Sequence, residues 1–182
     1  MRLYLDASVI IYAVESRLPF RDAVIARILQ AEGTAGGLII TSRLSRLECR
    51  VKPVREAKDD LLREYEEFFT RRLVRVAEIT ASIIERSTDL RARYGVRTPD
   101  AIHFATAIDE HSDQFLTGDA VLARCTEVPV EVLRLREPAS RTGRAVDLGV
   151  DVMNVLGRGR GSAVRGIMSR EIVHELAGLY HS

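Results

Sequence analysis

The strongest constraint on the fold is a regular alternation of short apolar runs with longer amphipathic segments. Short apolar runs are typical of buried strands, and apolar residues spaced three and four apart are typical of helices. The predicted strands cover residues 2–5, 38–41, 73–77, 115–117 and 130–133. Strands that alternate with helices favour an α/β fold, in which a mostly parallel sheet has helices on both faces.

Residues with strong positional preferences mark the ends of several predicted helices. Thr80 suits the N-cap of a helix that ends near Tyr94, and Gly95 suits the left-handed position just after it. Further helices are predicted after Asp6 as far as Val14, after Pro19, and over 58–70, 98–108 and 119–124.

One more helix is expected to start at Ser42, directly after the second strand. Its apolar residues Leu44, Leu47 and Val51 follow helical spacing and are predicted to form the buried face. Pro53 is expected to break or bend this helix, because proline removes a backbone donor and clashes with the preceding turn.

The composition fits one compact domain with an appendage. The chain has 182 residues, of which 46% are hydrophobic, and its net charge is +1. It has no run of 18 apolar residues and no secretory signal pattern, so we expect no membrane span and, by default, a cytoplasmic location. Cys49 and Cys125 lie far apart and are interpreted as idle thiols.

The character of the sequence changes after residue 136. Residues 138–166 contain Pro138 and six glycines, and the stretch GRGRGSAVRG over 157–166 is predicted to form a flexible basic linker. Residues 169–180 have helical spacing. We therefore divide the chain into a domain over 1–136 and a C-terminal extension over 137–182.

Four acidic residues fall where predicted strands end or helices begin. Asp6 follows the first strand, Asp119 follows the fourth, and Asp100 lies in the first turn of its helix. Because the carboxyl ends of parallel strands meet at one edge, Asp6 and Asp119 are expected to converge. Glu48 lies in the helix after the second strand, where it can face inward.

Clustered carboxylates favour a divalent cation, because a cation relieves their mutual repulsion. Mg²⁺ prefers oxygen ligands and binds one or two carboxylates together with water and a substrate phosphate. Such a site can activate a bound water and stabilise the leaving oxygen of a phosphodiester. The sequence therefore predicts a site for Mg²⁺ or Mn²⁺ at Asp6, Glu48, Asp100 and Asp119.

Each acid also has a purely structural interpretation. Asp6 and Asp119 could be helix N-caps, and Asp100 could complement a helix dipole. Glu48 could complete a capping box with Ser45. A structural role for all four is the less favoured alternative, because their positions match the expected crevice at the sheet edge.

Four segments carry a resemblance to a known family. LYLDASVIIYAVE, SRLSRLEC, RTPDAIHFATAI and FLTGDAVL occur in this order within residues 2–133. Each is weak alone, but together they resemble the PIN-domain family, and within it the VapC-type ribonuclease toxins of prokaryotic toxin–antitoxin pairs. The resemblance implies a PIN-like fold, which is a Rossmann-like three-layer α/β/α sandwich with a mostly parallel central sheet.

The resemblance also implies an activity, partners and roles for particular residues. Such toxins are metal-dependent endoribonucleases that typically cut structured RNA, often tRNA or rRNA, and a cognate antitoxin holds them inactive. They usually form homodimers. The family's acids fall on Asp6, Glu48, Asp100 and Asp119, and its hydroxyl partners fall on Ser8 and Thr117.

Two other functions stay open at this point. One is a PIN nuclease that acts in RNA processing or on DNA without an antitoxin, and the other is a non-catalytic module that binds RNA or protein. The extension over 137–182 lies beyond the resemblance. It could cover the cleft, add a basic contact to RNA, or have no role.

Other polar residues lie close to the acids in the sequence. His103 shares a helix face with Asp100 and is interpreted as a hydrogen-bonded structural histidine, with a general acid or phosphate contact as the alternative. Arg43, Arg46 and Arg50 follow helical spacing near Glu48. These arginines could bind RNA phosphates or an antitoxin carboxylate, or form a solvated face.

Overall fold

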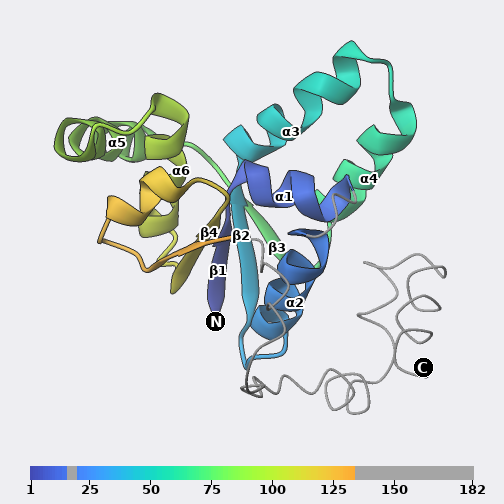
Figure 1. The fold of residues 1–182 in the computed structure, drawn as a ribbon, viewed down its shortest axis with the longest axis horizontal. Coiled ribbons are helices and arrows are strands. Elements are labelled where there is room, and N and C mark those ends of the chain that lie inside the picture. Colours follow the sequence, from blue (N-terminus) through green and yellow to red (C-terminus); the bar gives the residue numbers. More distant parts are fainter. Residues whose placement is uncertain (16–19, 134–182) are drawn as a thin grey trace, which may run out of the picture. The chain divides into compact units, whose positions relative to one another are not determined.

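A parallel five-stranded sheet forms the core of the domain that the structure describes (Figure 1). The computed structural model describes residues 1–15 and 20–133. The strands are β1 (Arg2–Leu5), β2 (Leu38–Ser42), β3 (Val74–Ala77), β4 (Gln114–Thr117) and β5 (Val130–Val132). They lie in the order β3-β2-β1-β4-β5, and every neighbouring pair is parallel. The predicted parallel sheet is confirmed.

Helices cover both faces of this sheet. They are α1 (Ala7–Val14), α2 (Phe20–Glu32), α3 (Arg43–Arg55), α4 (Asp59–Phe69), α5 (Ala81–Tyr94) and α6 (Thr98–Asp109), with a 3₁₀ turn, η1 (Ala120–Arg124). The α2 helix packs against β1 and β2, and α6 packs against β2 from the opposite face (Figure 1). The pair α3 and α4 projects away from the sheet (Figure 1). This is the expected three-layer α/β/α sandwich.

Aromatic side chains join the sheet to α6. Tyr4, Phe104 and Phe115 are fully buried. The rings of Tyr4 and Phe115 are stacked with their centroids 5.0 Å apart, and the centroid of Phe104 lies 5.3 Å from that of Phe115. Because these rings pack β1, β4 and α6 together, they hold the helix that carries Asp100 and His103 in place.

The predicted ends of α5 are confirmed. The Thr80 hydroxyl accepts a hydrogen bond from the backbone N–H of Ile83, as an N-cap does. Gly95 has φ +64°, a left-handed conformation that glycine adopts without the strain of a side chain.

The predicted buried face of α3 is wrong. Leu47 and Val51 are 59% and 53% exposed, and Leu44 is only partly buried. The buried residues are instead small or compact and lie four apart: Ser45, Cys49 and Pro53. The helix also continues past Pro53 as far as Arg55, so the proline does not break it.

Some expectations concern residues outside the described ranges. These are the role of Pro19 in starting α2, the glycine-rich linker and the helix over 169–180. Within the described ranges, no helix is both long and apolar enough to cross a bilayer.

Candidate active site

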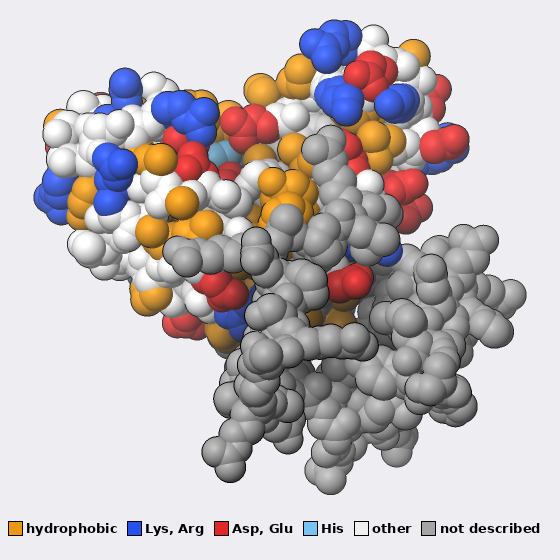
Figure 2. Space-filling model, in the orientation of Figure 1, with side chains coloured by type: hydrophobic (Ala, Val, Ile, Leu, Met, Phe, Trp, Pro, Cys, Tyr) orange, Lys and Arg blue, Asp and Glu red, His pale blue; other side chains and the backbone are white. Residues whose placement is uncertain are grey.

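All four predicted acids line one cleft at the carboxyl edge of the sheet. Its volume is about 660 Å³. Asp6 follows β1, Asp119 follows β4, Glu48 lies on α3 and Asp100 lies in the first turn of α6. Figure 2 shows acidic side chains gathered in a hollow between the α5–α6 part and the α1–α3 part, with a histidine among them.

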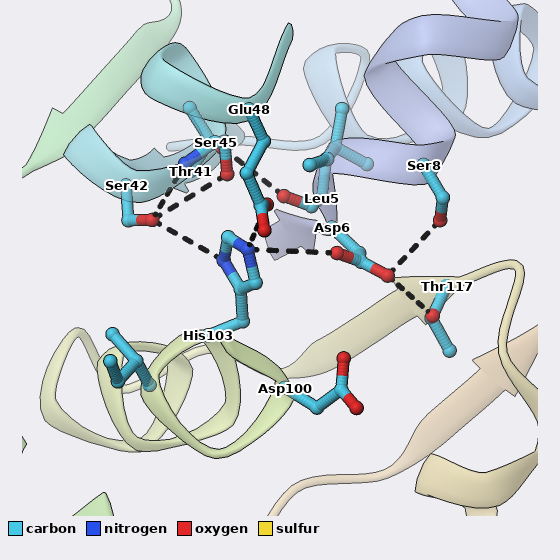
Figure 3. A network of polar contacts seen from close by, with 12 residues as sticks. Leu5, Asp6, Ser8, Thr41, Ser42, Ser45, Glu48, Asp100, His103 and Thr117 are labelled. Atoms are coloured by element: carbon cyan, nitrogen blue, oxygen red, sulfur yellow. Dashed lines mark hydrogen bonds and ion pairs between the residues drawn. The ribbon is translucent and has the colours of Figure 1, made fainter. Parts of the chain in front are cut away.

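Asp6 is held in a fixed orientation by two hydroxyl groups. Its carboxylate Oδ2 accepts hydrogen bonds from Ser8 Oγ at 3.0 Å and from Thr117 Oγ1 at 2.7 Å (Figure 3). Asp6 stands at the N-cap position of α1, but its side chain makes no capping hydrogen bond. The capping interpretation is therefore wrong for this residue, and Oδ1 stays free to face the cleft, where it lies 3.8 Å from His103 Nε2.

Asp100 and Asp119 share one cationic partner, Arg97. The Arg97 Nε lies 2.9 Å from Asp100 Oδ2, and its Nη2 lies 3.1 Å from Asp119 Oδ2. Asp119 also caps η1, because its Oδ1 accepts a hydrogen bond from the backbone N–H of Val121. The capping interpretation is thus confirmed for Asp119, although its second oxygen remains in the cleft. Our sequence interpretation did not include Arg97, although its position three residues before Asp100 is a recognisable i,i+3 signal.

Glu48 is paired with a buried histidine. His103 Nε2 lies 2.8 Å from Glu48 Oε2, and on the other side of the ring Nδ1 lies 3.3 Å from Ser42 Oγ (Figure 3). Nδ1 also lies 3.0 Å from Tyr4 Oη. A carboxylate can only accept, so Nε2 carries the proton toward Glu48. In the neutral ring Nδ1 is then the acceptor for the hydroxyl groups. His103 is therefore hydrogen-bonded, as predicted, but it also supports an acid of the cleft.

The residue at which α3 begins excludes a capping box between Ser45 and Glu48. The N-cap of α3 is Ser42, whose hydroxyl accepts from the backbone N–H of Ser45. A capping box that pairs Ser45 with Glu48 would need the helix to begin three residues later. The Glu48 carboxylate is instead available to the cleft and to His103.

Burial keeps the nearby phenol and thiol protonated. Desolvation raises the pKa of the Tyr4 phenol far above its ordinary value, and the nearby Asp6 charge acts in the same direction. Burial also raises the pKa of the Cys49 thiol, as do the negative charges of Glu48 and Asp6. Cys49 is therefore no thiolate nucleophile, and the prediction of an idle thiol agrees with its burial.

The donor atoms of the cleft suit a hard cation in an open site. Its acids offer carboxylate oxygens, the ligands that Mg²⁺ and Mn²⁺ prefer. In the part of the chain that the structure describes, no three His, Cys, Asp or Glu side chains are grouped closely enough to form a metal cage by themselves. Magnesium rarely uses such a cage, because waters and substrate phosphate complete its coordination. The residues therefore fit an ion that is bound jointly with the substrate.

The arginines of α3 are engaged with acids of this chain. Arg43 pairs with Glu78, and Arg46 and Arg50 pair with Glu66. The pair of Arg43 and Glu78 is exposed, and exposed pairs of this kind are weak, which agrees with a solvated position for Arg43. Arg46 and Arg50 are partly buried against Glu66, so a solvated face does not describe these two positions.

Solved structures with the same fold include VapBC2, a toxin–antitoxin complex and the toxin VapC20. VapBC2 of Rickettsia felis, solved with promoter DNA, has a TM-score of 0.60 at 16% identity, covering 72% of this chain and 98% of that one. A toxin–antitoxin complex from Klebsiella pneumoniae has a TM-score of 0.55 at 21% identity, covering 69% and 94%. VapC20 of Mycobacterium tuberculosis, a toxin that cleaves the sarcin–ricin loop, has a TM-score of 0.54 at 17% identity, covering 70% and 98%.

The sequence itself matches one family over most of its described length. The comparison with curated proteins gives no match. The PIN domain family, in contrast, matches residues 3–128, a range that contains all four acids of the cleft. With the parallel sheet, the layered helices and the order of the motifs in agreement, this chain belongs to the PIN domain family.

Proposed function

We propose that this protein is an endoribonuclease that uses Mg²⁺ or Mn²⁺. The observation that carries the proposal is that four carboxylates from four separate parts of the chain line one cleft, namely Asp6, Glu48, Asp100 and Asp119. These four residues would hold the ion. A divalent cation there lowers the pKa of a bound water and stabilises the leaving oxygen of a phosphodiester.

The surrounding residues hold the carboxylates in position. Ser8 and Thr117 donate to the same oxygen of Asp6 and leave the other facing the cleft. His103 donates to Glu48 from its buried position on α6. Such supporting hydrogen bonds orient metal-binding carboxylates and limit the reorganisation needed when substrate binds.

We further propose that the chain is the toxin of a type II toxin–antitoxin pair, located in the cytoplasm and acting on structured RNA such as tRNA or rRNA. The fold similarity to toxins in antitoxin complexes supports this proposal. Apolar residues of α3 support it independently, because Leu47 and Val51 line the cleft and, with Val54, are exposed. Exposed apolar side chains beside an active site are typical of a partner surface, here for an antitoxin or a second copy in a homodimer.

The test is induction in cells followed by sequencing of new RNA 5′ ends, with Asp100→Asn as the inactive control. We expect new ends and growth arrest with the wild type, neither with the variant, and rescue when a cognate antitoxin is expressed together with the wild type. New ends without growth arrest would favour a processing nuclease instead. The absence of new ends, together with no Mn²⁺ binding in calorimetry, would favour a non-catalytic module.

Replacing His103 with alanine is expected to weaken Mn²⁺ binding by about 10–100-fold, because Glu48 loses the donor that orients it. Isothermal titration without RNA measures this effect. His103→Gln, whose amide can still donate toward Glu48, should restore most of the affinity. If His103 served only the core, His103→Ala would lower the melting temperature and leave the Mn²⁺ affinity unchanged.

A further inference from the structure

Arg97 has an unusual position among the residues of the cleft. It stands at the N-cap of α6, and its side chain is 75% exposed. Of the described residues that line the cleft, it is the only arginine or lysine. Its guanidinium bridges Asp100 and Asp119, which come from different elements and would otherwise repel each other.

The bridge stands where a divalent cation would have to act. Arg97 holds Oδ2 of both Asp100 and Asp119, and Asp119 Oδ1 already accepts from the backbone N–H of Val121, so a cation can take either Oδ2 only if the guanidinium leaves it. Leaving is inexpensive, because ion pairs made by an exposed arginine are weak.

A displaced guanidinium would remain at the mouth of the cleft. Arg97 is tethered to the first turn of α6, one turn or less from Asp100. Its planar fork binds phosphate oxygens with the same geometry that it uses for carboxylates. Arg46 and Arg93 differ in this respect, because their partners Glu66 and Glu127 do not line the cleft, so a cation bound there does not compete for those carboxylates.

We propose that Arg97 exchanges partners during the reaction cycle. In the metal-free protein Arg97 neutralises Asp100 and Asp119. When a divalent cation takes these carboxylates, the Arg97 guanidinium binds a phosphate of the RNA strand in the cleft. This inference rests on the proposed nuclease function and extends it. It makes Arg97 a competitor of the metal and a ligand of the substrate, so its removal has opposite effects on the two affinities.

Isothermal titration with Mn²⁺ in the absence of RNA tests whether Arg97 competes with the metal for Asp100 and Asp119. Arg97→Ala is expected to bind Mn²⁺ about threefold more tightly than the wild type, because a weak competing ion pair is lost. Arg97→Lys keeps the positive charge but lacks the planar guanidinium that bridges both acids, so its Mn²⁺ affinity should lie between those of the wild type and Arg97→Ala. Arg93→Ala, which removes an exposed arginine outside the cleft, should match the wild type. Unchanged or weaker Mn²⁺ binding by Arg97→Ala would overturn the inference.

RNA binding in the presence of a divalent cation tests whether Arg97 contacts a phosphate of the RNA. The probe is a fluorescein-labelled single-stranded oligoribonucleotide, followed by anisotropy with Ca²⁺ as the cation and with RNA integrity checked on a gel. Arg97→Ala is expected to bind about tenfold more weakly, and its slope of log affinity against log salt should be smaller by about 0.7. Arg93→Ala should match the wild type. Equal RNA affinity and equal slope in Arg97→Ala and wild type would reject a phosphate contact.

The two experiments separate this inference from the proposed function. If the wild type does not bind Mn²⁺, or binds it equally well after Asp100→Asn, the proposed metal site is wrong and the inference fails with it. If the wild type binds Mn²⁺ through Asp100 but Arg97→Ala does not tighten that binding, only the exchange of partners is rejected.

Discussion

Replacing Asp6 with asparagine is expected to lower kcat/KM for RNA cleavage by about 10³-fold while the fold stays intact. The substitution removes one negative charge from the best-buried acid of the cleft, whose side chain is only 12% exposed. Charge stabilisation by a bound cation is worth several kcal/mol in the transition state, and each 1.36 kcal/mol is about a factor of ten in rate. Asparagine has nearly the same shape and can still accept from Ser8 and Thr117, so packing should be preserved.

The measurement is cleavage of RNA by purified protein at saturating Mn²⁺, with circular dichroism and the melting temperature as checks on the fold. Asp109→Asn is the matched control, because it makes the same substitution at an exposed position near the end of α6. We expect the control to keep wild-type activity. Wild-type activity in Asp6→Asn, with Mn²⁺ binding unaltered, would remove Asp6 from the proposed site.

Replacing Phe115 with alanine is expected to lower the free energy of unfolding by about 3–5 kcal/mol. The side chain is fully buried in β4, between the rings of Tyr4 and Phe104. Its removal loses the transfer free energy of the ring and leaves a cavity that a parallel sheet, hydrogen-bonded on both edges of β4, cannot collapse to fill. A loss of this size is comparable to the whole stability of a marginal domain.

Urea denaturation measures the free energy of unfolding of Phe115→Ala, with Phe115→Leu and Val54→Ala for comparison. Leucine fills part of the volume of the ring, so Phe115→Leu should lower the free energy of unfolding less than Phe115→Ala does. Val54 is exposed on α3, and its truncation should change stability by less than about 0.5 kcal/mol. If Phe115→Ala lost no more than Val54→Ala, the packing of α6 against β4 through these rings would be wrong.

The stability of this aromatic cluster also matters for the site. Tyr4 donates to His103 with its hydroxyl and stacks on Phe115 with its ring. The same side chain therefore belongs to the core and to the chain of hydrogen bonds that ends at Glu48. A variant that loosens the rings is expected to loosen the orientation of Glu48 as well.

The sequence predicts the elements of this fold well because their signals are local. Strand runs, the Thr80 cap and the Gly95 terminus each depend on a few neighbouring residues, and the structure confirms them. The face of α3 was predicted wrongly because helical spacing alone does not say which of two candidate faces meets the sheet. In the structure Ser45 and Cys49 pack inward, and Leu47 is exposed beside the cleft.

By itself, the sequence determined the order of strands and helices and the placement of acids at strand and helix ends, from which their meeting at one edge follows. The family resemblance also pointed to Ser8 and Thr117 as hydroxyl partners, and both hold Asp6. Only the tertiary structure decided that Glu48 is held by His103 and Asp100 by Arg97. These contacts join residues whose side-chain directions depend on helix rotation and on the packing between layers. Local spacing carries no information about such directions, because they are set by which buried surfaces fit together.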